Sequence, residues 1–204
     1  MNYTIILRHA ERHHITNFEN TEIASLTLKG KINSILMGNF LRKKFENITL
    51  IKTSYIERCY ITAKYLKLGY APFKKIEIKR ARNNGELVSS GYIKNENFWD
   101  WIKYQHSIKK DWTKFREYYA EMIKKKWAQF NSIEDYTNEF MKENLTDQNT
   151  LIITHDTTLI PILYGINKYN KDRFPKTLSG IIIHHENTII KKVDWIEQNK
   201  IENI

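Results

Sequence analysis

Short apolar runs alternate with longer stretches of helical spacing along this chain. Residues 3–7 are mostly apolar and residues 149–154 contain the apolar run 151–153, which is typical of strands buried on both faces. Residues 28–45 carry apolar residues at helical spacing, and Thr27 before them is a suitable N-cap. One side of this predicted helix would bear Ile32, Ile35, Leu36, Phe40 and Leu41.

The rest of the chain continues this alternation. Its patterns predict strands at 47–54 and 74–79, helices at 56–66 and 157–164, and a hairpin of 179–185 with 188–195. A polar loop is expected over about 81–92. Residues 97–142 are rich in Trp, Tyr and Lys and have helical character, with a break near 131–132 where a helix start follows.

Strands that alternate with helices predict an α/β fold. We expect a three-layer sandwich: a mostly parallel central sheet flanked by helices, with a helical insertion at about 97–142 near the active site. The chain has 204 residues with only three prolines and seven glycines, so a single domain over 1–204 is expected. In such sheets ligands bind at the carboxyl ends of the parallel strands.

Composition narrows the class of protein. The formal net charge is +10, but only eight of the 33 basic residues are arginine, which favours a lysine-rich surface and anionic substrates over a nucleic-acid-binding patch. The apolar runs are too short to span a bilayer, and the first residues do not resemble a secretory signal. With Cys59 as the one cysteine, an internal disulfide is excluded and a cytoplasmic protein is expected.

Arginine and histidine collect after three of the predicted strands. The residues that follow the strands at 3–7, 47–54 and 149–154 include Arg8, His9, Arg12, Arg58, His155 and Asp156. If these strands are parallel, all six side chains face one crevice.

This set of side chains suits phosphoryl transfer. Guanidinium groups offer planar, permanently charged donors for a phosphate dianion, and an uncharged imidazole such as His9 can attack phosphorus and carry a covalent intermediate. A carboxylic acid, Asp156 or Glu86, could protonate the leaving alkoxide. A bound dianion helps to keep that acid protonated, because like charge disfavours the carboxylate.

Four segments in order resemble motifs of the histidine phosphatase superfamily, which includes phosphoglycerate mutases and histidine acid phosphatases. Residues 8–12 are similar to Arg-His-Gly-x-Arg, and residues 26–30 to the Leu-Thr-x-x-Gly that follows it. Residues 54–63 resemble Ser-x-x-x-Arg-x-x-x-Thr-Ala. Residues 154–159 resemble the His-Asp motif of the acid-phosphatase branch.

The resemblance implies a phosphoglycerate mutase-like fold and a role for each matched residue. His9 would be the nucleophile that becomes phosphohistidine. Asp156 would donate the proton, as in the acid-phosphatase branch, whereas the mutase-like branch uses a loop glutamate that Glu86 would match. Asp156 is favoured because it adjoins a residue of the pocket. The phosphate pocket would comprise Arg8, Arg12, Arg58 and His155.

The sequence also departs from the family pattern. Ala10 replaces the usual Gly, Tyr55 stands where many members have Pro, and His14 replaces a Pro of the acid-phosphatase branch. That branch is also mostly larger, secreted and disulfide-bonded. The physiological substrate therefore cannot be taken from either branch.

The favoured hypothesis is a metal-independent phosphomonoesterase that acts on a small phosphorylated substrate and needs no cofactor. The first alternative is a phosphomutase with the same pocket, which would use Glu86 and exclude water. The second is an inactive protein that binds phosphorylated ligands or RNA. A metal site is not expected, because no predicted helix carries a His-x-x-x-His motif, the chain has no cysteine pair, and the arginines would repel a divalent cation. No nucleic acid or membrane partner is expected, and the sequence does not indicate the oligomeric state.

Overall fold

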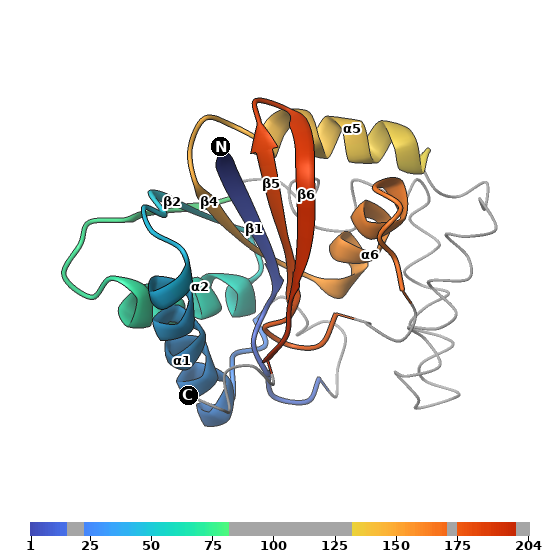
Figure 1. Ribbon diagram of the computed structural model, residues 1–204. Coiled ribbons are helices and arrows are strands. Elements are labelled where there is room, and N and C mark those ends of the chain that lie inside the picture. Colours follow the sequence, from blue (N-terminus) through green and yellow to red (C-terminus); the bar gives the residue numbers. More distant parts are fainter. Residues whose placement is uncertain (16–22, 82–131, 171–174, 199–204) are drawn as a thin grey trace, which may run out of the picture.

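A central sheet of six strands organises the computed structural model, which describes residues 1–15, 23–81, 132–170 and 175–198 (Figure 1). The strands are β1 (Asn2–Arg8), β2 (Leu50–Thr53), β3 (Glu77–Arg80), β4 (Thr150–Thr154), β5 (Gly180–Glu186) and β6 (Ile189–Ile196). The described helices are α1 (Leu28–Lys44), α2 (Glu57–Tyr70), α5 (Ile133–Asn144) and α6 (Asp156–Gly165).

The sheet has the order β3-β2-β4-β1-β5-β6 and is mostly parallel. The pairs β3–β2, β2–β4 and β4–β1 are parallel, while β5 pairs antiparallel with both β1 and β6. The predicted hairpin at the carboxyl end of the chain is therefore confirmed. In the parallel part Arg8 lies opposite Thr154, and Thr53 lies opposite Ile153, so three strands end side by side.

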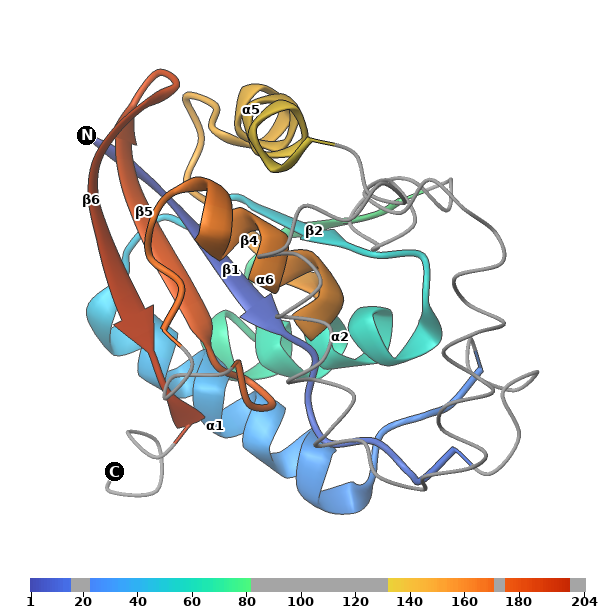
Figure 2. The same ribbon diagram turned by 90° about the vertical axis from the view of Figure 1, so that its right-hand side faces the viewer.

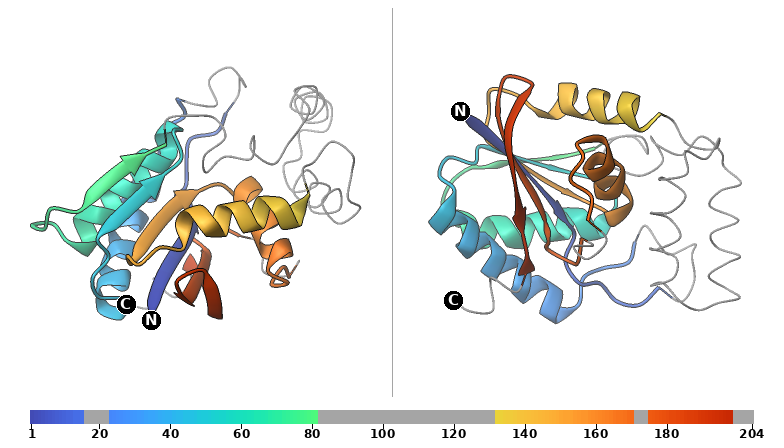
Figure 3. Two further views of the ribbon diagram at one scale, coloured as in Figure 1. Left: turned by 90° about the horizontal axis from the view of Figure 1, so that it is seen from above. Right: turned by 45° about the vertical axis from the view of Figure 1, so that its right-hand side comes forward.

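Helices cover both faces of the sheet, as predicted for a three-layer fold. α1 and α2 lie on one face, whereas α5 and α6 lie on the other (Figures 2 and 3). Side chains alternate along β1 accordingly: Ile5 and Leu7 pack toward α1 and α2, and Ile6 packs in the core beneath α5 and α6. Two apolar cores thus hold the sheet between them.

The predicted inward face of α1 is wrong in part. Ile32 is 49% exposed and Leu36 is 43% exposed, because the face that meets the sheet and α2 carries smaller residues. The buried residues of the helix are Gly30, Ser34, Met37, Gly38 and Leu41. A Cβ on Gly38 would lie 2.1 Å from the Leu66 carbonyl oxygen, so this helix pair packs backbone to backbone.

The predicted helix at 56–66 extends further, to Tyr70. Of the predicted helical insertion, α5 covers 133–144 and begins after Ser132, which accepts a hydrogen bond from the Asp135 amide. Positions 97–131 lie outside the described residues. Lys52 on β2 donates to the Glu143 carbonyl and so attaches the C-terminal end of α5 to the sheet. No helix within the described ranges is both long and apolar enough to cross a membrane.

Substitution of Gly38 by Ala tests the close helix contact. Alanine favours helix by about 1 kcal/mol over glycine, but its methyl group would collide with the α2 backbone. We expect a net loss of about 2 kcal/mol in the free energy of unfolding, measured by urea denaturation. Lys43→Ala, on the exposed end of the same helix, is the control and should change stability by less than about 0.5 kcal/mol. Unchanged or increased stability in Gly38→Ala would contradict this packing.

Candidate active site

The turns that follow β1, β2 and β4 meet at one edge of the sheet. The His9 amide donates to the Thr154 carbonyl at 2.9 Å, and the Ser54 amide donates to the Ile153 carbonyl at 3.1 Å. These bonds continue the parallel ladders one residue past the strands. Side chains that are far apart in sequence are thereby fixed next to one another by backbone hydrogen bonds.

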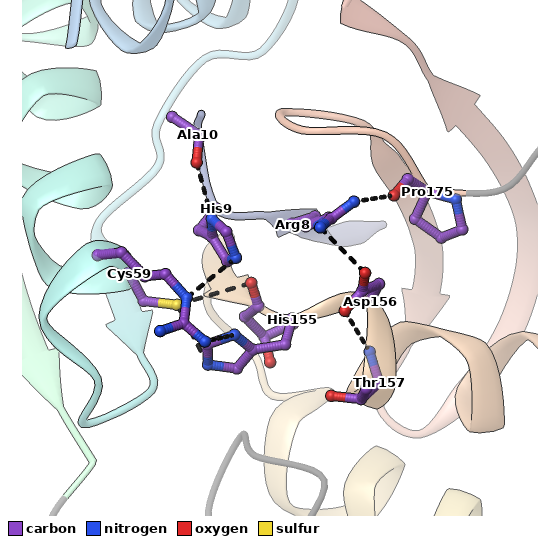
Figure 4. Close-up of polar contacts among 10 residues, drawn as sticks. Arg8, His9, Ala10, Cys59, His155, Asp156, Thr157 and Pro175 are labelled. Atoms are coloured by element: carbon purple, nitrogen blue, oxygen red, sulfur yellow. Dashed lines mark hydrogen bonds and ion pairs between the residues drawn. The ribbon is translucent and has the colours of Figure 1, made fainter. Parts of the chain in front are cut away.

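His9 lies at the centre of this edge (Figure 4). Its Nδ1 is 2.7 Å from the Ala10 carbonyl oxygen, which can only accept, so Nδ1 carries the ring proton. The lone pair is then on Nε2, which accepts a hydrogen bond from Arg58 Nε at 3.1 Å. The residue is 3% exposed. The ring is thus oriented with its nucleophilic nitrogen toward a guanidinium group.

The same guanidinium contacts a second imidazole. Arg58 Nη2 lies 3.3 Å from His155 Nδ1, and the ring centroids of His9 and His155 are 5.4 Å apart in an edge-to-face arrangement. Both Arg58 and His155 are buried. One guanidinium group therefore spans the two histidines from the first turn of α2.

Burial and positive charge keep both imidazoles uncharged. Desolvation lowers the pKa of His9 well below its usual range, and the charges of Arg58 and Arg8 lower it further. Desolvation lowers the pKa of His155 in the same way, followed by the charges of Arg58, Arg8 and Arg12. At neutral pH each ring therefore has one nitrogen with a lone pair.

Arg8 and Asp156 form an ion pair across the ends of β1 and α6. Arg8 Nη2 is 3.0 Å from Asp156 Oδ2, and Arg8 Nη1 donates to the Pro175 carbonyl at 3.1 Å. The Asp156 Oδ1 accepts from the Thr157 amide at 2.9 Å. The guanidinium is nearly buried, and the carboxylate is 18% exposed. The carboxylate therefore lies at the N-terminus of α6, where the helix dipole favours it.

Of the other two residues predicted for the site, Arg12 lies in the described part of the chain and Glu86 does not. Arg12 follows in the turn after His9, where its Nη1 donates to the His13 carbonyl at 2.9 Å. Its charge is close enough to lower the pKa of His155. Glu86, the rival proton donor, lies outside the described residues. The structure thus brings five predicted residues together in two contacting groups, Arg58 with the two histidines and Arg8 with Asp156, and places the Arg12 charge near His155.

Thr62 supports the turn that carries His9, a role that the sequence did not indicate. The Ala10 amide donates to Thr62 Oγ1 at 3.0 Å, and Thr62 Oγ1 donates to the Arg58 carbonyl at 2.7 Å. The motif around Arg58 therefore links the turn that carries His9 to α2 through one hydroxyl group. In the sequence, Thr62 is marked by the Thr-Ala pair that ends the motif at residues 54–63.

The Leu-Thr-x-x-Gly motif at residues 26–30 also supports the segment that follows His9. Thr27 Oγ1 accepts from the Gly30 amide at 2.9 Å and donates to Glu11 Oε1 at 2.9 Å. A Cβ on Gly30 would lie 2.1 Å from the Glu11 carbonyl oxygen. Only glycine lets the first turn of α1 approach this segment so closely. The motif therefore clamps the chain between His9 and Arg12.

Arg80 is a further residue at this edge that the sequence did not indicate. It ends β3, its Nε donates to the Tyr55 carbonyl at 2.7 Å, and its Nη2 contacts Glu57 Oε2 at 3.0 Å. The guanidinium also lies 5.0 Å from the centroid of the Tyr60 ring. Arg80 therefore braces the turn that leads into α2 and Arg58.

The described part of the site combines two uncharged imidazoles, several guanidinium groups and one carboxylate. Forked cationic donors beside uncharged imidazoles suit a tetrahedral oxyanion. Among the residues that the structure describes, no three histidine, cysteine, aspartate or glutamate side chains gather in a way that could hold a metal ion. The chemistry available from these side chains is nucleophilic attack by nitrogen with electrostatic support from arginine.

The low pKa of His155 predicts how stability depends on pH. In the unfolded chain this imidazole titrates at about 6.5, above its lowered pKa in the folded protein. Its contribution to stability is therefore complete above about pH 6.5 and is lost as the pH falls from there through the lowered pKa. Between pH 7.5 and 5.5, the free energy of unfolding should fall by about 1 kcal/mol less in His155→Gln than in the wild type.

Urea unfolding of the two proteins at each pH measures this difference. Because every other titrating group is common to both, the difference isolates His155. An identical fall in both proteins would contradict a lowered pKa.

Comparison with known proteins supports the fold. No protein-family model matches the chain, and no curated protein matches it. Solved structures do match over nearly the whole length. YhfR from Bacillus stearothermophilus has a TM-score of 0.55 at 16% identity, over 93% of this chain and 94% of its own.

Two further structures carry the names of phosphatases. Mycobacterial glucosyl-3-phosphoglycerate phosphatase has a TM-score of 0.53 at 14% identity and is covered over 96% of both chains. Phosphoserine phosphatase from Entamoeba histolytica, in complex with 3-phosphoglyceric acid, has a TM-score of 0.52 at 14% identity, over 97% of this chain and 99% of its own. The six-stranded sheet and its flanking helices therefore have the fold of the histidine phosphatase superfamily, the phosphoglycerate mutase-like fold.

Proposed function

We propose that this protein is a metal-independent phosphomonoesterase that hydrolyses a small phosphate ester through a phosphohistidine intermediate on His9. The observation that carries the proposal is the state of the His9 ring. Its proton is held on Nδ1 by the Ala10 carbonyl, and its Nε2 lone pair points to Arg58. A buried, uncharged imidazole beside a guanidinium group is a nucleophile next to a binding site for an anion.

In the first step His9 Nε2 attacks phosphorus. The N–P bond forms, the ester P–O bond breaks, and the leaving alkoxide takes a proton from the Asp156 carboxylic acid. In the second step water attacks the phosphohistidine and gives a proton to the Asp156 carboxylate. Cleavage of the N–P bond then releases inorganic phosphate and restores the lone pair on Nε2. Asp156 thus donates a proton in the first step and accepts one in the second.

The arginines and His155 would bind the transferring group. Arg58 already donates to both imidazoles, so its donors are directed at the region where the phosphoryl oxygens would lie. Arg8 and Arg12 add charge from the segment that carries His9. When a dianion contacts Arg8, it competes with Asp156 for the guanidinium group and favours the protonated acid that the first step needs.

The similar structures favour hydrolysis of a small ester. Their names describe phosphatases of glucosyl-3-phosphoglycerate and phosphoserine, both of which are phosphate monoesters. Identity of 14% does not transfer either substrate. The proposal is therefore limited to the class of small phosphate monoesters.

Replacement of His9 by Ala tests the nucleophile. Hydrolysis of p-nitrophenyl phosphate should continue in EDTA and fall by more than about a thousandfold in His9→Ala. His184→Ala, a partly exposed histidine on β5 that pairs with Asp194, is the matched control and should retain wild-type turnover. Full activity in His9→Ala, or loss of activity in EDTA, would contradict the proposal.

The choice of proton donor is tested by varying the leaving group. A p-nitrophenolate ion leaves without help, whereas an alkoxide needs a proton. Asp156→Asn should therefore slow hydrolysis of an alkyl phosphate by roughly a hundredfold or more, and slow the p-nitrophenyl ester much less. Glu86→Gln should affect both esters equally and weakly. If Glu86→Gln gives the leaving-group dependence instead, then Glu86 is the donor and Asp156 is not.

A further inference from the structure

Ser54 contacts the second histidine of the site from the turn after β2. It is fully buried, and its amide donates to the Ile153 carbonyl, which fixes its position at the sheet edge. Its Oγ lies 2.9 Å from His155 Nε2 and accepts a hydrogen bond from the Ile56 amide at 3.1 Å. The hydroxyl therefore joins His155 to the start of the segment that leads into α2.

The contacts of His155 determine which nitrogen carries its proton. Nδ1 faces Arg58 Nη2 at 3.3 Å, and a guanidinium group has donors only, so Nδ1 is the acceptor. The proton of the neutral ring is then on Nε2, and Ser54 Oγ is its nearest acceptor. Cys59 Sγ is also close, at 3.4 Å, but its thiol donates toward the Thr154 carbonyl and sulfur is a weak acceptor.

We propose that Ser54 is a positioning residue: its hydroxyl accepts the Nε2 proton of His155 and thereby fixes the tautomer opposite to that of His9. The two rings then present different nitrogens, Nε2 of His9 and Nδ1 of His155, to one edge of Arg58. A carbonyl oxygen orients the first ring and a hydroxyl group orients the second. Neither ring can rotate without losing its buried partner.

This arrangement has a consequence for anion binding, which rests on the proposed function. When a phosphate-like dianion takes the Arg58 donors, its oxygens meet the Nδ1 lone pair of His155. Lone pair and oxyanion repel unless Nδ1 gains a proton. Because Ser54 still accepts from Nε2, the doubly protonated ring keeps its orientation and donates to the anion. Binding of the dianion is therefore coupled to uptake of a proton.

The charges that face His155 agree with this coupling. From α2 it meets Arg58 and the neutral thiol of Cys59, whose pKa burial raises to about 11. From β1 and the turn after it come the positive charges of Arg8 and Arg12 and the uncharged ring of His9. The neighbouring carboxylate at the start of α6 is paired with Arg8. Before an anion binds, positive charge therefore dominates around Nδ1, and a dianion reverses that balance.

Nitrogen-15 NMR of histidine-labelled protein tests the tautomers without any substrate. In the wild type at pH 7.5, His155 should give the Nε2–H pattern and His9 the Nδ1–H pattern, assigned by comparison with His155→Gln and His9→Gln. Ser54→Ala should broaden or shift the His155 signals toward a mixture of tautomers, and Ser54→Thr should restore the wild-type pattern. Ser34→Ala is the control, because it also removes a buried hydroxyl, one that donates within α1 to the Gly30 carbonyl. It should leave His155 unchanged.

An Nδ1–H pattern for His155 in the wild type would overturn the proposal, even if Ser54→Ala failed to fold. An unchanged His155 pattern in Ser54→Ala would overturn it as well. Neither result depends on whether the protein hydrolyses phosphate esters.

Calorimetry with tungstate tests the coupling. Tungstate is a dianion at pH 7.5 and carries no titrating proton there, so the dependence of the binding enthalpy on the buffer measures uptake by the protein. The wild type should take up roughly one proton more than His155→Gln, because any proton that Asp156 takes up is common to both proteins. Ser54→Ala should take up less and bind tungstate about tenfold more weakly. Binding without proton uptake in the wild type would overturn the coupling.

Discussion

The site depends on one guanidinium group held between two uncharged imidazoles. Arg58 donates from Nε to His9 and from Nη2 to His155, and all three residues are buried. A buried cation needs acceptors, and two neutral rings supply them only if each has its lone pair turned inward. The Ala10 carbonyl and Ser54 hydroxyl on the outer sides of the rings meet that condition. The acceptors that hold Arg58 are thus the same nitrogens that would face a bound anion.

Backbone packing makes this contact possible. The two parallel pairings of β4, with β1 and with β2, bring the ends of these three strands level, and α2 starts directly beyond β2 with Arg58 in its first turn. The position of α2 is set in turn by its contact with α1. Gly38 of α1 and Gly69 of α2 let the two helix backbones touch. Thr62 then connects α2 to the turn that carries His9 by accepting a hydrogen bond from the Ala10 amide. The position of Arg58 relative to His9 therefore depends on glycine and threonine residues that do not themselves contact the two imidazoles.

The strands themselves and the grouping of charged residues at their ends could be predicted from the sequence, because short apolar runs identify buried strands and parallel strands end at one edge. The face of α1 could not. Hydropathy places Ile32 and Leu36 inside, but the buried face carries Gly38 where it meets α2 and Gly30 where it meets the Glu11 segment, and small residues carry little hydropathy signal.

The hydrogen bonds that support the site could not be predicted from the sequence either. Thr62 bonds to a residue 52 positions away and Ser54 to one 101 positions away, distances over which residue spacing carries no information. Arg80 shows the same limit, since a single arginine at the end of a half-exposed strand has no distinguishing pattern. A motif can show that a threonine or serine recurs beside an arginine. The hydrogen bond that explains it is visible only once the sheet has brought the segments together.

Charge balance links these observations to the choice of ligand. Three guanidinium groups and one carboxylate leave an excess of positive charge comparable with the charge of a phosphate dianion, and the imidazoles add none while they stay neutral. A monoester supplies such a dianion at neutral pH, whereas a diester, with a single negative charge, would leave the site cationic and buried. In the proposed mechanism a monoester would also let a proton move onto His155 and let Arg8 release Asp156 for protonation, and the second negative charge would favour both changes. Under the proposed function, the electrostatics of the described residues would therefore favour terminal phosphate groups over diesters, whatever the shape of the substrate.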